Sequence, residues 1–137
     1  MSAPHLDDFF SRHESESADV RDALAAWNAG GEAEVGPRAV PARELLDIYR
    51  ARAVHLWSKP TDHAHQLTAR ITALCDAIAP HPDREIAIVS VTAADGRAFT
   101  FFEDARSLKL VGSLYSYDAR KISDEEHIRV WGQPRPP

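Results

Sequence analysis

Four residues with metal-binding side chains lie close together in the middle of the chain: His55, Asp62, His63 and His65. Imidazole and carboxylate groups are the usual protein ligands of zinc and related metals. On a helix, however, His63 and His65 lie about 200° apart and cannot share an ion. The four residues are therefore weak candidates for a metal site, because they converge only if residues 60–64 form a loop. We favour a helix N-terminus with exposed histidines, in which His63 lies at the edge of the core.

Three carboxylates form a second candidate functional site. Glu103 and Asp104 end one expected strand, and Asp118 follows the next. If they converged at one end of a sheet, they could share a proton or hold a hard cation. Carboxylates are also common turn residues, and we favour that interpretation.

Cys75 is the single cysteine of the chain. A nucleophilic cysteine needs a lowered thiol pKa, which a position near the C-terminus of a helix does not supply. We expect Cys75 to be a small core residue. The chain also lacks a Gly-rich phosphate loop, G-x-S-x-G, H-E-x-x-H and a paired C-x-x-C. No catalytic residue and no cofactor is therefore assigned.

The elements that position these groups are organised around residues 85–117. Asp95-Gly96 separates two β-rich segments and predicts a hairpin with a two-residue type I′ turn, in which both residues have positive φ. That turn sets Val89 opposite Phe102. One face then carries Val89, Val91 and Phe102, and the other carries Ile86, Ile88, Phe99 and Phe101. Both faces are apolar, so the hairpin needs cover on each side.

Three helices are expected before the hairpin, over residues 17–29, 41–57 and 62–79. Ser17 and Thr61 are suitable N-caps of the first and third helices, and Pro41 suits the first turn of the second. Residues 30–40, punctuated by Gly and Pro, indicate a surface loop. The predicted buried stripe of the second helix is Leu45, Ile48, Tyr49, Ala53 and Leu56. That of the third is Leu67, Ile71, Leu74, Cys75 and Ile78.

After the hairpin, residues 108–117 indicate a third strand, with a bulge or a close backbone approach at Gly112. Ser123 and Glu126 match a helical capping box. The alternation of apolar and polar residues around Ile128 and Val130 nevertheless favours a short fourth strand over 123–131. Residues 133–137 are a Pro-rich tail that we expect to be mobile.

These elements predict one α+β domain over residues 1–132, with N-terminal helices packed on a small antiparallel β-meander of three to four strands. Residues 1–16 form an arm whose apolar residues Leu6, Phe9 and Phe10 have helical spacing. The favoured interpretation packs these side chains on the domain, and the alternative docks them on a partner. Which face of the sheet is covered stays open.

Composition excludes several classes of function. A net charge of −5 argues against a nucleic-acid-binding surface, and apolar and charged contents of 44% and 27% are ordinary for a globular protein. No segment has the apolar length needed to span a membrane, and the acidic N-terminus is unlike a signal peptide. Together with the single cysteine, these features predict a cytoplasmic protein. Arginine in excess of lysine and abundant alanine suggest a bacterial source.

Five aromatic residues gather near the C-terminus: Phe99, Phe101, Tyr115, Tyr117 and Trp131. If the helices cover only one sheet face, these rings form a protein-binding surface. The sequence then predicts a small acidic module that binds and occludes another protein, or that self-associates through its sheet. The helix-then-hairpin pattern with DGRAFTFFED resembles small bacterial immunity and regulatory domains, which implies an immunity-like, antitoxin-like or regulatory role.

Two other classes of function stay open. The first is a small-ligand sensor or carrier with a pocket between helices and sheet, lined by residues such as Trp57, Phe101 and Tyr115. The second is a metal-dependent enzyme that uses the region of His55 and His63. An enzyme is the least favoured class, because no catalytic constellation is present.

Overall fold

The computed structural model describes residues 4–135 of the chain, with side chains from residue 6 onward. Its helices are α1 (Pro4–His13), α2 (Ala18–Asn28), α3 (Ala42–Trp57), α4 (Asp62–Ile78) and α5 (Asp124–Trp131). Its strands are β1 (Glu32–Val35), β2 (Val40–Pro41), β3 (Glu85–Thr92), β4 (Arg97–Asp104) and β5 (Leu110–Tyr117). No helix within this range is long and apolar enough to cross a membrane.

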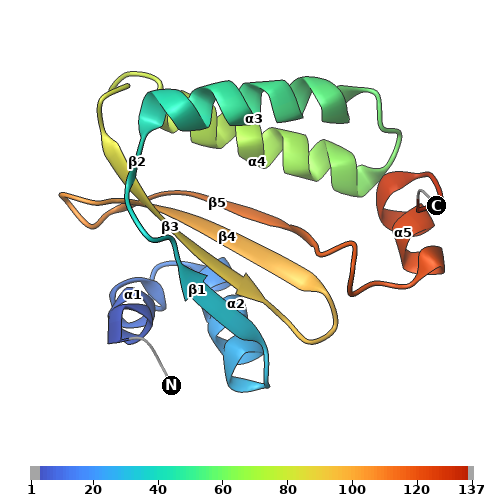
Figure 1. Cartoon of the computed structure of the whole chain (residues 1–137), viewed down its shortest axis with the longest axis horizontal. Coiled ribbons are helices and arrows are strands. Elements are labelled where there is room, and N and C mark those ends of the chain that lie inside the picture. The colour runs from blue at the N-terminus through green and yellow to red at the C-terminus, as the bar shows by residue number, and fades with distance from the viewer. Residues whose placement is uncertain (1–3, 136–137) are drawn as a thin grey trace.

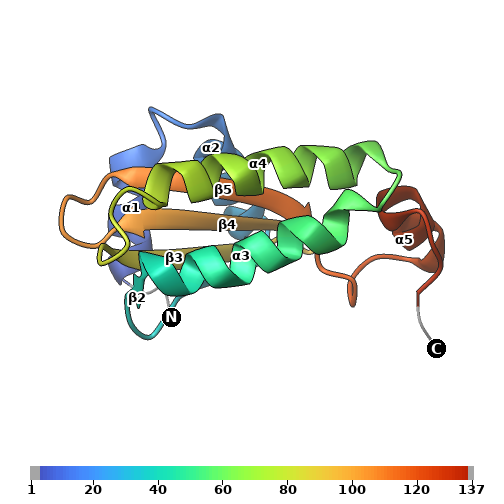
Figure 2. The ribbon, with the colours of Figure 1, turned by 90° about the horizontal axis from the view of Figure 1, so that it is seen from above.

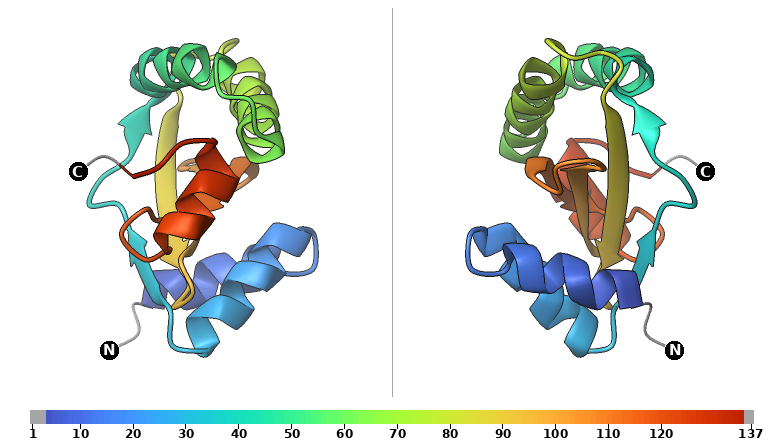
Figure 3. Two further views of the ribbon diagram at one scale, coloured as in Figure 1. Left: turned by 90° about the vertical axis from the view of Figure 1, so that its right-hand side faces the viewer. Right: turned by 90° about the vertical axis from the view of Figure 1, so that its left-hand side faces the viewer.

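The elements stack in three layers (Figure 1). Helices α3 and α4 lie on one side of the sheet, and α1 and α2 lie on the other, as the end-on views in Figure 3 show. The sheet is antiparallel throughout, in the order β1-β3-β4-β5, and β2 pairs with the other end of β3. This arrangement confirms the predicted α+β class with helices packed on a strand meander.

Residues 30–40 contain two short strands and are not simply a surface loop. Strand β1 pairs with β3 from Glu32 opposite Thr92 to Val35 opposite Val89, and β2 pairs with the start of β3. The prediction was wrong because Gly and Pro flank these strands closely and leave only a few residues for pairing. Their pairing protects the edge of β3, which would otherwise be open.

The β3–β4 hairpin has a three-residue loop, so the predicted two-residue type I′ turn is wrong. The N–H of Ala93 donates to the carbonyl of Arg97 at 2.8 Å, and the N–H of Gly96 donates to the carbonyl of Ala93 at 3.0 Å. Gly96 has φ of +98°, but Asp95 does not have positive φ. This is a type I turn followed by a glycine bulge. The longer loop slips the register by one residue, so that Val89 lies opposite Phe101.

The slip moves Phe99 and Phe101 to the sheet face that carries Val89 and Val91. There they pack with apolar side chains of α1 and α2: Leu6, Phe9, Phe10, Val20 and Ala23. Ile86 and Phe102 lie on the opposite face, with apolar side chains of α3 and α4. The arm therefore packs on the domain, as favoured from sequence, and each sheet face has a core of its own.

Capping residues determine where α2 and α4 begin. The hydroxyls of Ser17 and Thr61 accept hydrogen bonds from the backbone N–H groups of Val20 and Ala64, at 3.3 and 3.2 Å. All five predicted core residues of α4 are buried. In α3, Leu46 is buried and Ile48 is 58% exposed, the reverse of the prediction. The reason is that α3 packs chiefly against α4, which turns its buried face toward that helix.

Residues 124–131 form helix α5, so the predicted fourth strand is wrong. The Ser123 hydroxyl accepts a hydrogen bond from the N–H of Glu126 at 3.1 Å, and Gly132 ends the helix with φ of +77°. The capping box thus outweighed the short apolar alternation. In the expected mobile tail, Gln133 accepts a hydrogen bond from Lys59 at 3.0 Å. Pro136 and Pro137 lie outside the described residues.

Gly112 lies at a bulge, as predicted. The register between β4 and β5 shifts there, from Phe102 opposite Gly112 to Glu103 opposite Leu110. A Cβ atom built at Gly112 would lie 2.6 Å from Cδ1 of Leu74 in α4. The glycine therefore lets α4 approach β5 closely.

Candidate functional site

The four candidate metal ligands do not converge. His55 and His65 are exposed and His63 is half-buried. His55 lines a depression with Trp131, whereas His65 lines another with Trp57. Within the described part of the chain, no group of three His, Cys, Asp or Glu side chains is placed to hold a metal ion.

The strand-end carboxylates lie apart, and Asp104 and Asp118 take part in turns, as favoured from the sequence. Asp104 ends β4 and lies opposite Ile86, whereas Asp118 follows β5 and donates its N–H to the carbonyl of Gly96 at 2.8 Å. Because β4 and β5 are antiparallel, their C-terminal ends lie at opposite ends of the sheet.

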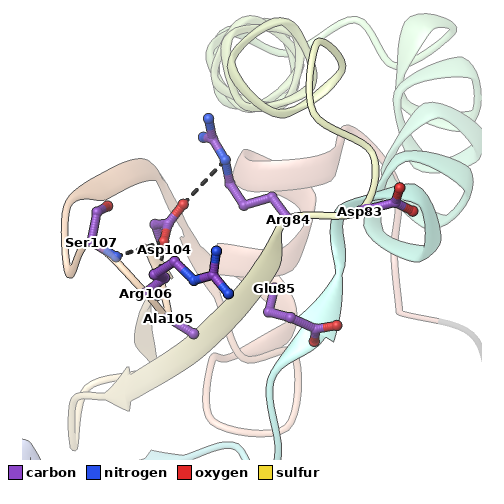
Figure 4. Close-up of a pocket in the computed structure, with 7 residues that line it drawn as sticks. All are labelled: Asp83, Arg84, Glu85, Asp104, Ala105, Arg106 and Ser107. Carbon is purple, nitrogen blue, oxygen red and sulfur yellow. Dashed lines mark hydrogen bonds and ion pairs between the residues drawn. The ribbon is translucent and has the colours of Figure 1, made fainter.

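The turn after β4 borders a surface pocket of about 600 Å³ (Figure 4). Asp104 accepts hydrogen bonds from the N–H groups of Arg106 and Ser107, both at 2.8 Å, and pairs with Arg84 at 3.1 Å. The backbone donors and Arg84 lower the pKa of Asp104. Figure 4 shows the Glu85 carboxylate directed away from this pair. The charged groups thus stabilise the turn and do not converge on a common point.

A buried polar cluster that sequence reasoning missed joins α1 to the sheet. The carboxylate of Glu103 contacts the Arg12 guanidinium at 2.9 and 3.1 Å and Nε2 of His13 at 2.5 Å. Glu103 and His13 are buried, and Nδ1 of His13 has no partner among the described residues. The only sequence signal was a carboxylate that follows the apolar run of β4. Its position against α1 indicates a structural role.

Of the three histidines considered as metal ligands, His63 is the one with a side-chain hydrogen-bond partner among the described residues. Its Nε2 lies 3.1 Å from the hydroxyl of Ser116 on β5, and its ring packs edge-on against Tyr117 and Trp131, with centroids 5.2 and 5.1 Å away. Burial lowers the pKa of His63, and so do the positive charges of Arg129 and Arg52. The imidazole is therefore neutral at neutral pH.

Helix α5 completes this end of the molecule. The Arg129 guanidinium lies 5.8 Å from the centre of the Tyr117 ring and pairs with Glu126 at 2.6 Å. The hydroxyls of Tyr115 and Tyr117 are 3.4 Å apart, and burial together with this contact raises the pKa of Tyr115 to about 12. Tyr115, Tyr117 and Trp131 are all partly exposed.

Phe99 and Phe101, in contrast, are 2% and 0% exposed. Phe9 of α1 lies over Phe101, with ring centroids 5.4 Å apart. The expected aromatic sheet surface is therefore wrong for these two residues, because α1 and α2 cover it. With α3 and α4 on the opposite side, helices cover both faces of the sheet.

The most exposed large apolar side chains lie instead on the outer face of α3. Trp57 is 81% exposed and Val54 is 76% exposed. Residues three apart on a helix are neighbours, so these two side chains form one apolar ridge. Trp57 also lines a shallow depression of about 300 Å³ with His65 and Thr68 of α4. Sequence reasoning placed Trp57 toward an internal pocket, because a tryptophan usually buries its ring.

The Ser116–His63 pair combines a hydroxyl with a neutral imidazole, as in hydrolases. A catalytic triad also needs a group that orients the second ring nitrogen. Among the described residues, no carboxylate bonds the other nitrogen of His63. A comparison of the chain with protein-family models, curated proteins and solved structures found no match.

Proposed function

We propose that this chain is a protein-binding module that docks on its partner through the α3–α4 face, which we define as Arg50, Val54, Trp57, His65 and Thr68. The supporting observation is the apolar ridge of Trp57 and Val54, which projects from α3 into solvent. Burying one such side chain is worth about 1.5–3 kcal/mol. Tryptophan is also among the residues most often found at the energetic centre of protein interfaces.

The α3–α4 face suits an amphipathic helix of the partner. Figure 2 views the two helices from above, side by side on the outside of the sheet. Thr68 lies beside Trp57 and is half-buried, and the exposed positions that follow it along α4 include the small residues Ala69, Thr72 and Ala73. Small side chains let another helix approach closely and place its apolar residues beside the tryptophan.

Arg50 adds charge specificity to the α3–α4 face. It precedes Val54 by one helical turn, is exposed, and forms no ion pair with the described carboxylates. We therefore expect an acidic side chain at the matching position of the partner helix. Such a module acts by occluding or regulating its partner, the immunity-like, antitoxin-like or regulatory role inferred from sequence.

The test compares the wild type with Trp57→Ala as bait for partners from the native host. The expected result is one stoichiometric protein that the wild type retains and Trp57→Ala loses. Calorimetry with the purified partner should then show at least about tenfold weaker binding by the variant, as for an interface hot spot. Because Trp57 is exposed, its removal should leave the melting temperature unchanged.

Ile48→Ala is the matched control. Ile48 is also an exposed apolar residue of α3, at 58%, and lies outside the α3–α4 face. It should bind the partner like the wild type. Equal loss in both variants, or a partner that Trp57→Ala retains at full strength, would show that the interface lies elsewhere.

A further inference from the structure

A small pocket lies between α3, α4 and the sheet, near the C-terminal end of β5. Its volume is about 130 Å³. The lining residues come from four elements: Tyr49, Arg52, Leu67, Ala98, Thr100, Leu114, Ser116 and Tyr117. Leucine and alanine side chains supply its apolar part. Its polar part consists of hydroxyl-bearing residues and one guanidinium, which are hydrogen-bond donors.

The charge of this pocket is positive although the chain is acidic. No carboxylate is among its lining residues, and Arg52 forms no ion pair with the carboxylates that the structure describes. The positive charge of Arg52 also reaches Tyr49 and His63: burial raises the pKa of Tyr49 and Arg52 partly offsets that rise, whereas burial, Arg129 and Arg52 all lower the pKa of His63. An unpaired guanidinium beside hydroxyl groups is the usual environment of a bound oxyanion.

A second pocket of about 300 Å³ adjoins the first at the side chain of Arg52. Its lining also lacks carboxylates and consists of Arg52, His55, Leu56, Lys59, His127, Trp131 and Gln133. Trp131 is partly exposed, so part of its ring is available to a ligand. A planar ligand group can stack on this indole ring, and Lys59 adds a further positive charge.

We propose that these two pockets bind one small organic anion, with its oxyanion group at Arg52 and Ser116 and its planar body against Trp131. We call the two together the Arg52 site. The smaller pocket has the volume of roughly four water molecules at about 30 Å³ each, which is large enough to admit a phosphoryl or carboxylate group. The larger pocket is near the lower end of the roughly 300–1,000 Å³ range of small-ligand sites.

The Arg52 site is separate from the α3–α4 face. Arg52 and Trp57 lie about 140° apart around α3, since a helix turns by about 100° per residue. Arg52 faces α5 and the sheet, whereas Trp57 faces His65 on the outside of α4. A ligand at the Arg52 site is therefore compatible with a protein on the outer face, and each proposal can fail without the other.

The ligand is identified by nuclear magnetic resonance titration of the full chain in phosphate-free buffer. The probes are inorganic phosphate, phenyl phosphate and benzoate. Phenyl phosphate should bind more tightly than inorganic phosphate, and should shift the Trp131 indole N–H together with the amides of Thr100 and Ser116. Benzoate separates carboxylate from phosphoryl recognition: the tighter of the two aromatic probes names the preferred oxyanion.

His63 provides an independent readout. Its ring lies against Ser116 and Tyr117 of β5 and Trp131 of α5, and the charges acting on it are those of Arg129 and Arg52. A bound anion would offset these positive charges and favour the imidazolium form. The measured pKa of His63 should therefore rise when the site is filled.

Arg52→Gln tests the site, with Arg50→Gln as the matched control. Both remove one positive charge from an exposed position of α3, but Arg50 does not line either pocket. We expect Arg52→Gln to weaken phenyl phosphate binding by about tenfold or more, as the loss of a charge-assisted hydrogen bond predicts, and Arg50→Gln to change it less than about twofold. Equal weakening in both variants, unchanged binding by Arg52→Gln, or no response to any probe would overturn the proposal.

Discussion

The carboxylate of Glu103 on β4 lies 2.5 Å from Nε2 of His13, the last residue of α1, although 90 positions separate them in the chain. Arg12 closes the cluster from the partly exposed side. The helix nearest the N-terminus is therefore joined to the central strand by a charged pair as well as by Phe9 and Phe10. Because α1 covers Phe101, this contact keeps the aromatic sheet face out of solvent.

Glu103→Gln should lower the free energy of unfolding by about 2–4 kcal/mol, since it leaves the positive charge of Arg12 without its buried partner. The expected loss is below that of a fully buried pair, because the Arg12 side chain is 32% exposed. Urea denaturation measures it. Asp83→Asn is the control: it breaks the exposed pair of Arg43 and Asp83 and should cost less than about 0.5 kcal/mol. Equal small losses would show that the cluster adds nothing to stability.

The parts of the fold that local chemistry determines were predictable from sequence. Ser17 and Thr61 cap helices at the expected positions, and the apolar spacing of α4 correctly identified its buried residues. Residues 123–131 show the limit of this reasoning. A capping box and a two-residue apolar alternation competed over a short segment, and the alternation carried too few residues to decide.

The face of the sheet on which each phenylalanine lies was not predictable. Asp95-Gly96 fits both a two-residue loop and the last two positions of a three-residue loop, and the two choices differ by one residue in register. Because side chains alternate along a strand, this single residue exchanged the faces of Phe99 and Phe102. Arg52, Ser116 and Trp131 come together only through the packing of α3, β5 and α5, so no sequence spacing indicated the Arg52 site.

Gly96 and Gly30 separate backbone strain from steric clash. Both have positive φ, +98° and +101°, which disfavours any residue with a Cβ atom. A Cβ at Gly96 would also lie 2.7 Å from Cγ2 of Ile122, whereas none of the atoms around Gly30 lies within 4 Å of a Cβ. We expect Gly30→Ala to cost about 1 kcal/mol and Gly96→Val about 1–3 kcal/mol or more. Thermal denaturation gives both values, and equal costs would contradict the contact with Ile122.

Gly112→Ala tests the close approach of α4 to β5. The new Cβ would lie 2.6 Å from Cδ1 and 3.3 Å from Cβ of Leu74, so the leucine would have to move within a packed core. We expect a loss of about 1–3 kcal/mol in the free energy of unfolding, typical of overpacking. Gly36→Ala is the control, because its Cβ would meet its nearest neighbour at an ordinary 3.5 Å. A Gly112→Ala protein as stable as Gly36→Ala would mean that the two elements pack less tightly than described.

His63 should make stability depend on pH. Burial and the charges of Arg129 and Arg52 lower its pKa in the folded chain below the ordinary value of 6.5. As the pH falls through about 6.5, the unfolded chain therefore binds a proton before the folded chain does, which favours unfolding. The penalty grows until the pH drops below the pKa of the folded state, where both states are protonated. The contribution of neutral His63 is thus fully present above about pH 7 and is lost on acidification.

The measurement is the free energy of unfolding in urea at about pH 7.5 and about pH 5.5 for the wild type, His63→Gln and His55→Gln. The buried histidines His13 and His127 are present in all three proteins, so their contributions cancel in the comparison. We expect His63→Gln to lose less stability between the two pH values than the wild type, because glutamine does not titrate. Because His55 is exposed, His55→Gln should lose as much stability between the two pH values as the wild type does. If His63→Gln keeps the full pH dependence of the wild type, the imidazole is not held in the neutral form by its surroundings.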